Sequence, residues 1–302
     1  MKIIERKETR DSAVNGRNAH RLICITAAQR SGTTALQFAL EAAGLKIFSE
    51  VFHTAPLNDG AGSFVRFARE HNVRLCETTT RAEVVKIADS YLGWIRELSA
   101  SRHIVIDVKL NSWPVLSPWW RYPHQEPFFL THLKRQKAVL IFIWRENLAD
   151  QLLSQLIACE FGIWHNLTAE KTAGRTLTAP LGRLKELAGW VTRAEVELLD
   201  HLRDYPLKIV LRYEDLFTPN DLSDTFRQRF AEVAEIDLPK RTLMPVRPNT
   251  VPKRSIVTNY DEITSALAPF ASWRRVEWEK RTRFKGDLHL DLPYFGAFDC
   301  AV

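Results

Sequence analysis

Cysteine is scarce in this chain, with 4 residues among 302. The four stand far apart and show neither the paired spacing of a disulfide framework nor the short repeats of a zinc site: Cys24, Cys76, Cys159 and Cys300. This pattern excludes a disulfide-stapled scaffold and predicts a reducing compartment, the cytoplasm. The 9 histidines form no HExxH or comparable cluster, so we predict that the protein needs no metal.

Long apolar runs are also missing. No stretch approaches the roughly 20 apolar residues that a membrane-spanning helix needs, so we expect no membrane span. Residues 1–20 are charged and lack the apolar core of a signal peptide, and we expect them to form a flexible arm. Lys and Arg outnumber Asp and Glu by only 42 to 36, without a basic block. This mild excess favours a local site for an anion and argues against a nucleic-acid partner.

Short apolar runs alternate with helical patterns along the rest of the chain. The runs predict buried strands at 22–27, 103–110, 138–144 and 207–211. Between them, helices are predicted at 34–43, at 82–99, from 148 onward and at 184–202. The helix at 82–99 is expected to bury Val84, Ile87, Tyr91, Ile95 and Leu98. This alternation predicts an α/β protein with a mostly parallel sheet, whose ligands bind at the carboxyl ends of the strands.

The stretch LICITAAQRSGTT resembles the start of a phosphate-binding loop, because a strand turns through a glycine into a helix. The first helical N–H groups have no helical partner and can hold an anion. Gly32 lets the backbone approach a ligand, Arg30 adds charge, and hydroxyls come from Ser31, Thr33 and Thr34. The GxxxxGK[ST] spacing and its lysine are absent, which argues against a nucleoside triphosphate. From the turn alone, anion binding and simple architecture remain equally open.

Polar residues follow several of the predicted strands. Arg30, Lys109, Arg145 and Tyr213 all stand at strand ends. In a parallel sheet such ends meet at one edge, so we expect a single anion site there. Taken alone, Lys109 is equally consistent with a solvent-facing lysine, and Arg145 with a local ion pair.

In order and spacing, these motifs resemble the sulfotransferases that use 3′-phosphoadenosine 5′-phosphosulfate (PAPS). The likeness is to bacterial carbohydrate sulfotransferases of the trehalose-sulfating type and covers about residues 21–260. It implies an α/β, P-loop-like three-layer fold with one domain at 21–302. In that family a TxRSGTT-like loop binds the 5′-phosphosulfate, which maps to Arg30, Ser31, Gly32, Thr33 and Thr34. The family's leading threonine is replaced, since this chain has AAQRSG.

Two further motifs carry the resemblance. WRENLADQLLSQ supplies Arg145 and Ser154, which match the family's ligands for the donor's 3′-phosphate. RYEDL supplies Tyr213, which matches the tyrosine that lies against the adenine. Glu214 and Asp215 in that motif are interpreted as structural rather than catalytic.

The family's metal-free chemistry suggests roles for the basic residues. Arg30 would stabilise the leaving oxygen, and Lys109 resembles a family lysine that faces the sulfuryl group. Lys253 and Arg254, in VPKRSIVTNYDEI, are similar to a late basic loop that closes over the 3′-phosphate. This last match rests on two basic residues alone.

The acceptor hydroxyl needs a base, because an unactivated alcohol is a poor nucleophile at neutral pH. Glu50, in IFSEVFH, is the first candidate, since related carbohydrate sulfotransferases place a glutamate after the first helix. His53 is the second, since many small-molecule sulfotransferases use histidine. Their histidine follows a strand-end lysine, where this chain has Asn111, and this departure favours Glu50. Without the resemblance, Glu50 could equally be a salt-bridged loop anchor.

The sequence therefore predicts a PAPS-dependent O-sulfotransferase that releases adenosine 3′,5′-bisphosphate. A carbohydrate or glycolipid acceptor is favoured, and a small secondary metabolite is the alternative. Acceptor loops are placed near 111–131, which carries 4 prolines and is predicted to lack long regular elements, and near 161–182. The candidate acceptor-facing aromatic residues are Trp113, Trp119, Trp120, and those from Phe161 to His165. A P-loop kinase or nucleotide hydrolase, a non-catalytic nucleotide-binding module and a homodimer stay open.

Overall fold

The computed structural model describes residues 20–53, 60–76, 78–117, 125–164, 168–218, 221–240 and 251–283. The expected arm at 1–20 lies outside these ranges except for its last residue, as do Trp119, Trp120, His165 and Cys300.

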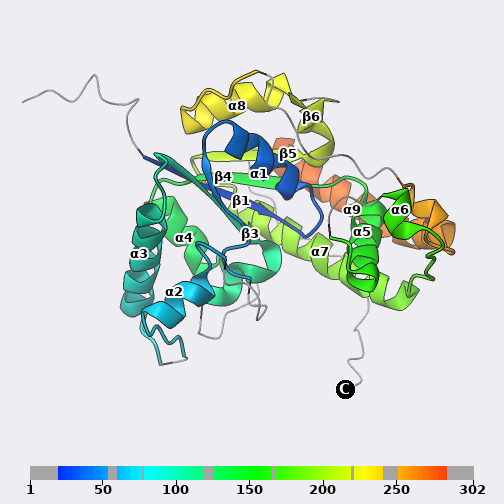
Figure 1. Ribbon diagram of the computed structural model, residues 1–302, viewed down its shortest axis with the longest axis horizontal. Coiled ribbons are helices and arrows are strands. Elements are labelled where there is room, and N and C mark those ends of the chain that lie inside the picture. Colours follow the sequence, from blue (N-terminus) through cyan, green and yellow to red (C-terminus); the bar gives the residue numbers. More distant parts are fainter. Residues whose placement is uncertain are drawn as a thin grey trace, which may run out of the picture.

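The core of the protein is a five-stranded sheet in the order β2-β3-β1-β4-β5 (Figure 1). Its strands are β1 (Arg21–Ala27), β2 (Lys46–Phe48), β3 (His103–Lys109), β4 (Val139–Trp144) and β5 (Lys208–Arg212). All of its strand pairs are parallel, and Ala27 at the end of β1 is in register with Lys109 and Ile143. The carboxyl ends therefore meet at one edge. The prediction of an α/β fold with a mostly parallel sheet is confirmed.

Helices cover both faces of the sheet, which gives the expected three layers (Figure 1). On one face lie α1 (Thr33–Ala42) and α8 (Asp224–Ala234); on the other lie α3 (Arg81–Glu97), α4 (Phe128–Arg135), α5 (Leu148–Phe161), α7 (Leu181–His201) and α9 (Tyr260–Arg283). Alternation along the strands produces this division. In β1, Ile23 and Ile25 pack with the first group, while Leu22 and Cys24 pack with the second.

The smaller elements connect these layers. They are α2 (Phe64–Glu70), η2 (Leu110–Leu116), α6 (Ala169–Thr172), η3 (Tyr213–Asp215), β6 (Phe217–Thr218), β7 (Asp221–Leu222) and η4 (Lys253–Ser255). Strand β2 was not predicted, because three residues carry no periodicity. None of the helices described here is both long and apolar enough to cross a bilayer.

Helix α3 corrects one detail of the sequence analysis. A capping box of Thr80 and Glu83 starts the helix, and Val84, Tyr91 and Ile95 are fully buried as expected. Leu98, however, is 40% exposed, because the helix ends at Glu97 and Leu98 only caps it. The prediction that Leu98 continues the buried face is wrong.

The proline-rich stretch also differs from expectation. Helix α4 begins within it, directly after Pro127, where the missing N–H of proline costs no hydrogen bond. Trp113 lies in η2 and is only 4% exposed, and its indole N–H donates to Thr26 Oγ1 at 3.1 Å. Trp113 is a core residue, so the interpretation of its ring as acceptor-facing is wrong.

Candidate functional site

The loop between β1 and α1 has the geometry of an anion cradle. Arg30 and Gly32 adopt positive φ angles of 64° and 82°. A Cβ atom at Gly32 would lie 2.2 Å from the ring of Tyr213, so only glycine fits there. No side chain caps the N-terminus of α1 in the described part of the chain, which leaves its first N–H groups available to a ligand.

Lys109 reaches into this cradle rather than into solvent. It is the last residue of β3, is 3% exposed, and its Nζ donates to Thr33 Oγ1 at 2.5 Å. Asp107 Oδ2 accepts a second bond from Nζ at 2.7 Å. The alternative of a solvent-facing lysine is therefore wrong. Asp107, 1% exposed, was missed by the sequence analysis because it lies inside an apolar strand.

The two candidate bases lie beside this lysine. Glu50 stands in the turn after β2 with φ at 44°, and its Oε1 is 4.0 Å from Lys109 Nζ. Its Oε2 is 3.9 Å from His53 Nε2. Both side chains are partly exposed, at 35% and 39%, so each is accessible to an acceptor. Glu50 is the one that contacts the buried lysine.

On the other side of the loop, the guanidinium group of Arg145 contacts the main chain of Arg30. Arg30 Nε donates to Ser154 Oγ at 3.1 Å, and its NH1 donates to the Trp164 carbonyl at 2.6 Å. Arg145, directly after β4, donates from NH1 to the Arg30 carbonyl at 3.3 Å. Burial, then the charge of Arg145, lowers the pKa of Arg30. The charge of an anionic ligand would oppose this lowering, because it favours the protonated guanidinium.

The Asp150 carboxylate contacts Arg145 together with a lysine and a tyrosine hydroxyl. Its Oδ2 lies 3.3 Å from Arg145 NH2 and 2.9 Å from Lys253 Nζ, and Tyr260 donates to its Oδ1 at 3.3 Å. Burial lowers the pKa of Lys253, although Asp150 opposes the shift. Arg254 does not join this group, because it pairs with Asp261 and is 70% exposed.

Residues of the RYEDL segment contact Arg145 and the turn that carries it. Arg145 Cζ lies 5.2 Å from the centroid of the Tyr213 ring. Glu214 accepts from the backbone N–H of Glu146 at 3.0 Å and so fixes the turn that carries Arg145. Asp215 pairs with the neighbouring arginine of the same motif. These contacts agree with the structural interpretation of Glu214 and Asp215.

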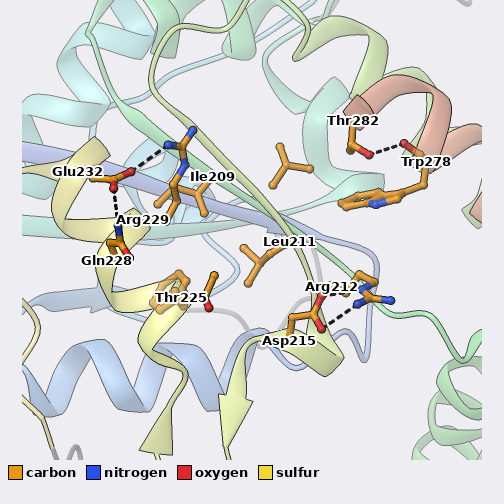
Figure 2. Close-up of a pocket in the computed structure, with 12 residues that line it drawn as sticks. Ile209, Leu211, Arg212, Asp215, Thr225, Gln228, Arg229, Glu232, Trp278 and Thr282 are labelled. Atoms are coloured by element: carbon orange, nitrogen blue, oxygen red, sulfur yellow. Dashed lines mark hydrogen bonds and ion pairs between the residues drawn. The ribbon is translucent and has the colours of Figure 1, made fainter. Parts of the chain in front are cut away.

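A separate groove of about 510 Å³ runs along β5, which is an edge strand of the sheet, between α8 and α9 (Figure 2). Its arginines are already neutralised, since Arg212 pairs with Asp215 and Arg229 with Glu232. None of the cations around the β1–α1 loop lines it. The groove therefore offers a mostly apolar surface and not an anion site.

Among the described residues, the loop site shows no candidate metal centre. Across the ranges that the structure covers, no three His, Cys, Asp or Glu side chains are grouped as metal ligands. Independence from a metal stays a prediction.

Comparison with solved structures gives a weak likeness. No family model and no curated protein sequence matches the chain. Among solved structures, the sulfotransferase domain of the Synechococcus PCC 7002 olefin synthase is similar over 90% of this chain and 97% of that one, with 15% identity and a TM-score of 0.37. At this level of similarity, the activity has to be argued from the site itself.

Proposed function

We propose that the protein transfers a sulfuryl group from PAPS to an alcohol hydroxyl. The observation that supports this most is the grouping of Arg30, Lys109 and Arg145 around an uncapped helix N-terminus at the carboxyl edge of the sheet. Cations this close repel one another, so the site favours a ligand with several anionic groups. A bisphosphorylated nucleotide carrying a sulfuryl group has that charge.

The donor would lie across two parts of the site. The loop N–H groups and Arg30 would hold the 5′-phosphosulfate. Arg145, Ser154 and Lys253 would hold the 3′-phosphate, with Tyr213 against the adenine. The hydroxyl of Ser31 is buried and accepts from Gln151, so the contribution of Ser31 to the ligand is its N–H. Lys253 takes this role rather than Arg254, which is turned to Asp261.

The reaction would be an in-line displacement at sulfur. The acceptor oxygen forms the new S–O bond while the bond from sulfur to the 5′-phosphate oxygen breaks, and the acceptor proton passes to a base. Arg30 and Lys109 would stabilise the charge that develops on the leaving and sulfuryl oxygens. Asp107 accepts a hydrogen bond from Lys109 Nζ and so keeps this group directed toward the loop.

We assign the base to Glu50, because it lies in contact with Lys109 at the mouth of the loop. A carboxylate there can take the acceptor proton as the S–O bond forms. His53, 3.9 Å from Glu50, is the alternative base. The two assignments separate by variant: loss of transfer in Glu50→Gln with donor affinity unchanged supports Glu50, whereas the same result in His53→Gln supports His53.

The acceptor is proposed to be a carbohydrate or glycolipid, with a small metabolite as the alternative. Parts of the acceptor loops expected near 111–131 and 161–182, namely residues 118–124 and 165–167, lie outside the described residues. A kinase or nucleotide hydrolase is disfavoured, because the loop has no lysine for the β- and γ-phosphates.

Calorimetric titration tests the proposal. We expect tight binding of adenosine 3′,5′-bisphosphate, much weaker binding of adenosine 5′-monophosphate, and no requirement for Mg²⁺. A preference for ATP with Mg²⁺ would overturn the proposal in favour of phosphoryl chemistry.

A further inference from the structure

One buried amide holds the β1–α1 loop from the protein side. Gln151, on α5, is fully buried, and its Nε2 donates to the Gln29 carbonyl at 2.9 Å and to Ser31 Oγ at 2.8 Å. These two contacts flank Arg30, which has a positive φ of 64°. A non-glycine residue in that region costs about 1 kcal/mol and persists only where its surroundings enforce it. Gln151 supplies that enforcement.

The orientation of the amide is set by a buried ion pair behind it. Arg274, on α9, is 1% exposed, and its NH1 donates to Gln151 Oε1 at 3.4 Å. Its Nε lies 3.1 Å from Glu195 on α7, and its Cζ lies 4.9 Å from the centroid of the Trp144 ring. A guanidinium can only donate, so it must meet the oxygen end of the amide. The nitrogen end is thereby turned toward the loop.

We propose that Gln151 is a positioning residue for donor binding, and that the Arg274–Glu195 pair fixes the direction of its amide. The chain of contacts runs from α7 and α9 through α5 to Ser31, and none of Glu195, Arg274 and Gln151 needs to touch the ligand. The identity of the ligand rests on the proposed function, but the positioning of the loop does not. Packing of α7 against α9 would thus influence affinity at the anion cradle (Figure 1).

Two variants of Gln151 test the amide directly. Gln151→Met keeps the size and removes all three bonds, whereas Gln151→Glu keeps an acceptor for Arg274 and removes the donor to the loop. We expect each to raise the dissociation constant for adenosine 3′,5′-bisphosphate about tenfold, the scale of a lost buried hydrogen bond. Wild-type affinity in Gln151→Glu would overturn the proposal.

A matched pair on α9 separates positioning from general stability. Arg281 is also buried between α9 and α7, where it pairs with Asp200 at 2.9 Å, but it contacts neither Gln151 nor the loop. We expect Arg274→Met and Arg281→Met to lower the melting temperature, while only Arg274→Met weakens binding, by about tenfold. Equal losses of affinity in both variants would assign the effect to stability and overturn the proposal.

Hydrogen exchange provides a readout that needs no ligand. In Gln151→Met, amides of the segment 29–34 should exchange faster than in the wild type, with those of β1 unchanged. If the wild type fails to bind the bisphosphate but the variant still loosens this segment, the proposed function fails and the positioning role stands. If the wild type binds and the variant changes neither affinity nor exchange, only the positioning role fails.

Discussion

Two arginine-bearing surfaces of this protein differ in how their charges are paired. In the groove along β5, each arginine has its own carboxylate, as in the pair of Arg229 and Glu232 at 3.0 Å (Figure 2). At the β1–α1 loop, Arg30 and Arg145 contact each other, and one carboxylate, Asp150, serves both Arg145 and Lys253. The same residue type therefore makes a neutral surface in one place and the proposed anion site in the other. The difference lies in whether an arginine has a carboxylate of its own or shares one with another cation.

Among the variants that test this comparison, removal of a loop arginine should have the largest effect on activity. We expect Arg30→Ala to lower the rate of sulfuryl transfer by about a thousandfold, the scale of losing a preorganised group at the leaving oxygen. Arg229→Ala, in the groove, should leave the rate unchanged. The measurement is turnover of labelled PAPS with a panel of hydroxyl acceptors, and comparable losses in both variants would contradict the assignment.

Gly32 and Gly44 provide a second comparison, between two glycines with similar backbone angles. Both have positive φ, at 82° and 88°. A Cβ added at Gly32 would lie 2.2 Å from the Tyr213 ring, whereas one added at Gly44 would meet no atom within 4 Å among the described residues. Gly32→Ala should displace Tyr213 and weaken nucleotide binding about a hundredfold, because both the β1–α1 loop and the Tyr213 ring would be misplaced relative to the ligand. Gly44→Ala should cost about 1 kcal/mol of stability and no affinity. Titration and thermal unfolding check the pair.

The two lysines at opposite ends of strands allow a third test. Lys109 contacts Thr33 of the loop, whereas Lys208, at the start of β5, donates to the Leu202 carbonyl at 2.6 Å. Lys109→Met should lower transfer about a hundredfold, because a positioned cation near the sulfuryl group is lost. Lys208→Met should lower only the melting temperature. Unchanged transfer in Lys109→Met would return this lysine to a structural role.

The smallest expected effect concerns pH. Desolvation raises the pKa of Glu195 to about 7, although the charge of Arg274 opposes the rise. The folded protein therefore binds this proton more tightly than the unfolded chain, and the resulting stability is present at about pH 4 and lost as pH rises through 7. In Glu195→Gln, the melting temperature should depend less on pH between about pH 5 and 7 than it does in the wild type. Glu232→Gln should not, since arginine and glutamine bonds lower the pKa of this exposed group.

Much of the site was predictable because strand ends are visible in the sequence. Arg30, Lys109, Arg145 and Tyr213 follow apolar runs, and a parallel sheet necessarily brings those positions to one edge. The same argument predicted the order of strands and helices. Only the resemblance indicated Lys253, whose place beside Asp150 the structure shows.

The supporting contacts were not predictable, because they join distant segments. Gln151 and Ser31 are 120 positions apart, and Gln151 and Arg274 are 123 apart, with no local pattern to connect them. Asp107 lies within an apolar strand, so its neighbours in the sequence do not mark it as polar. Trp113 lies in a proline-rich stretch typical of a surface loop, but it packs in the core. Tertiary packing determines the burial and the contacts of such residues, and hydrophobic periodicity does not predict that packing.

The most direct measurement compares two ligands and two proteins. Wild type and Arg145→Ala are titrated with adenosine 3′,5′-bisphosphate and with adenosine 5′-monophosphate. If the loop site holds a PAPS-type donor, Arg145→Ala weakens binding of the bisphosphate by tenfold or more, the scale of a lost charge-assisted bond, and scarcely changes binding of the monophosphate. Equal losses for both ligands would contradict the account, because Arg145 would then not contact the 3′-phosphate.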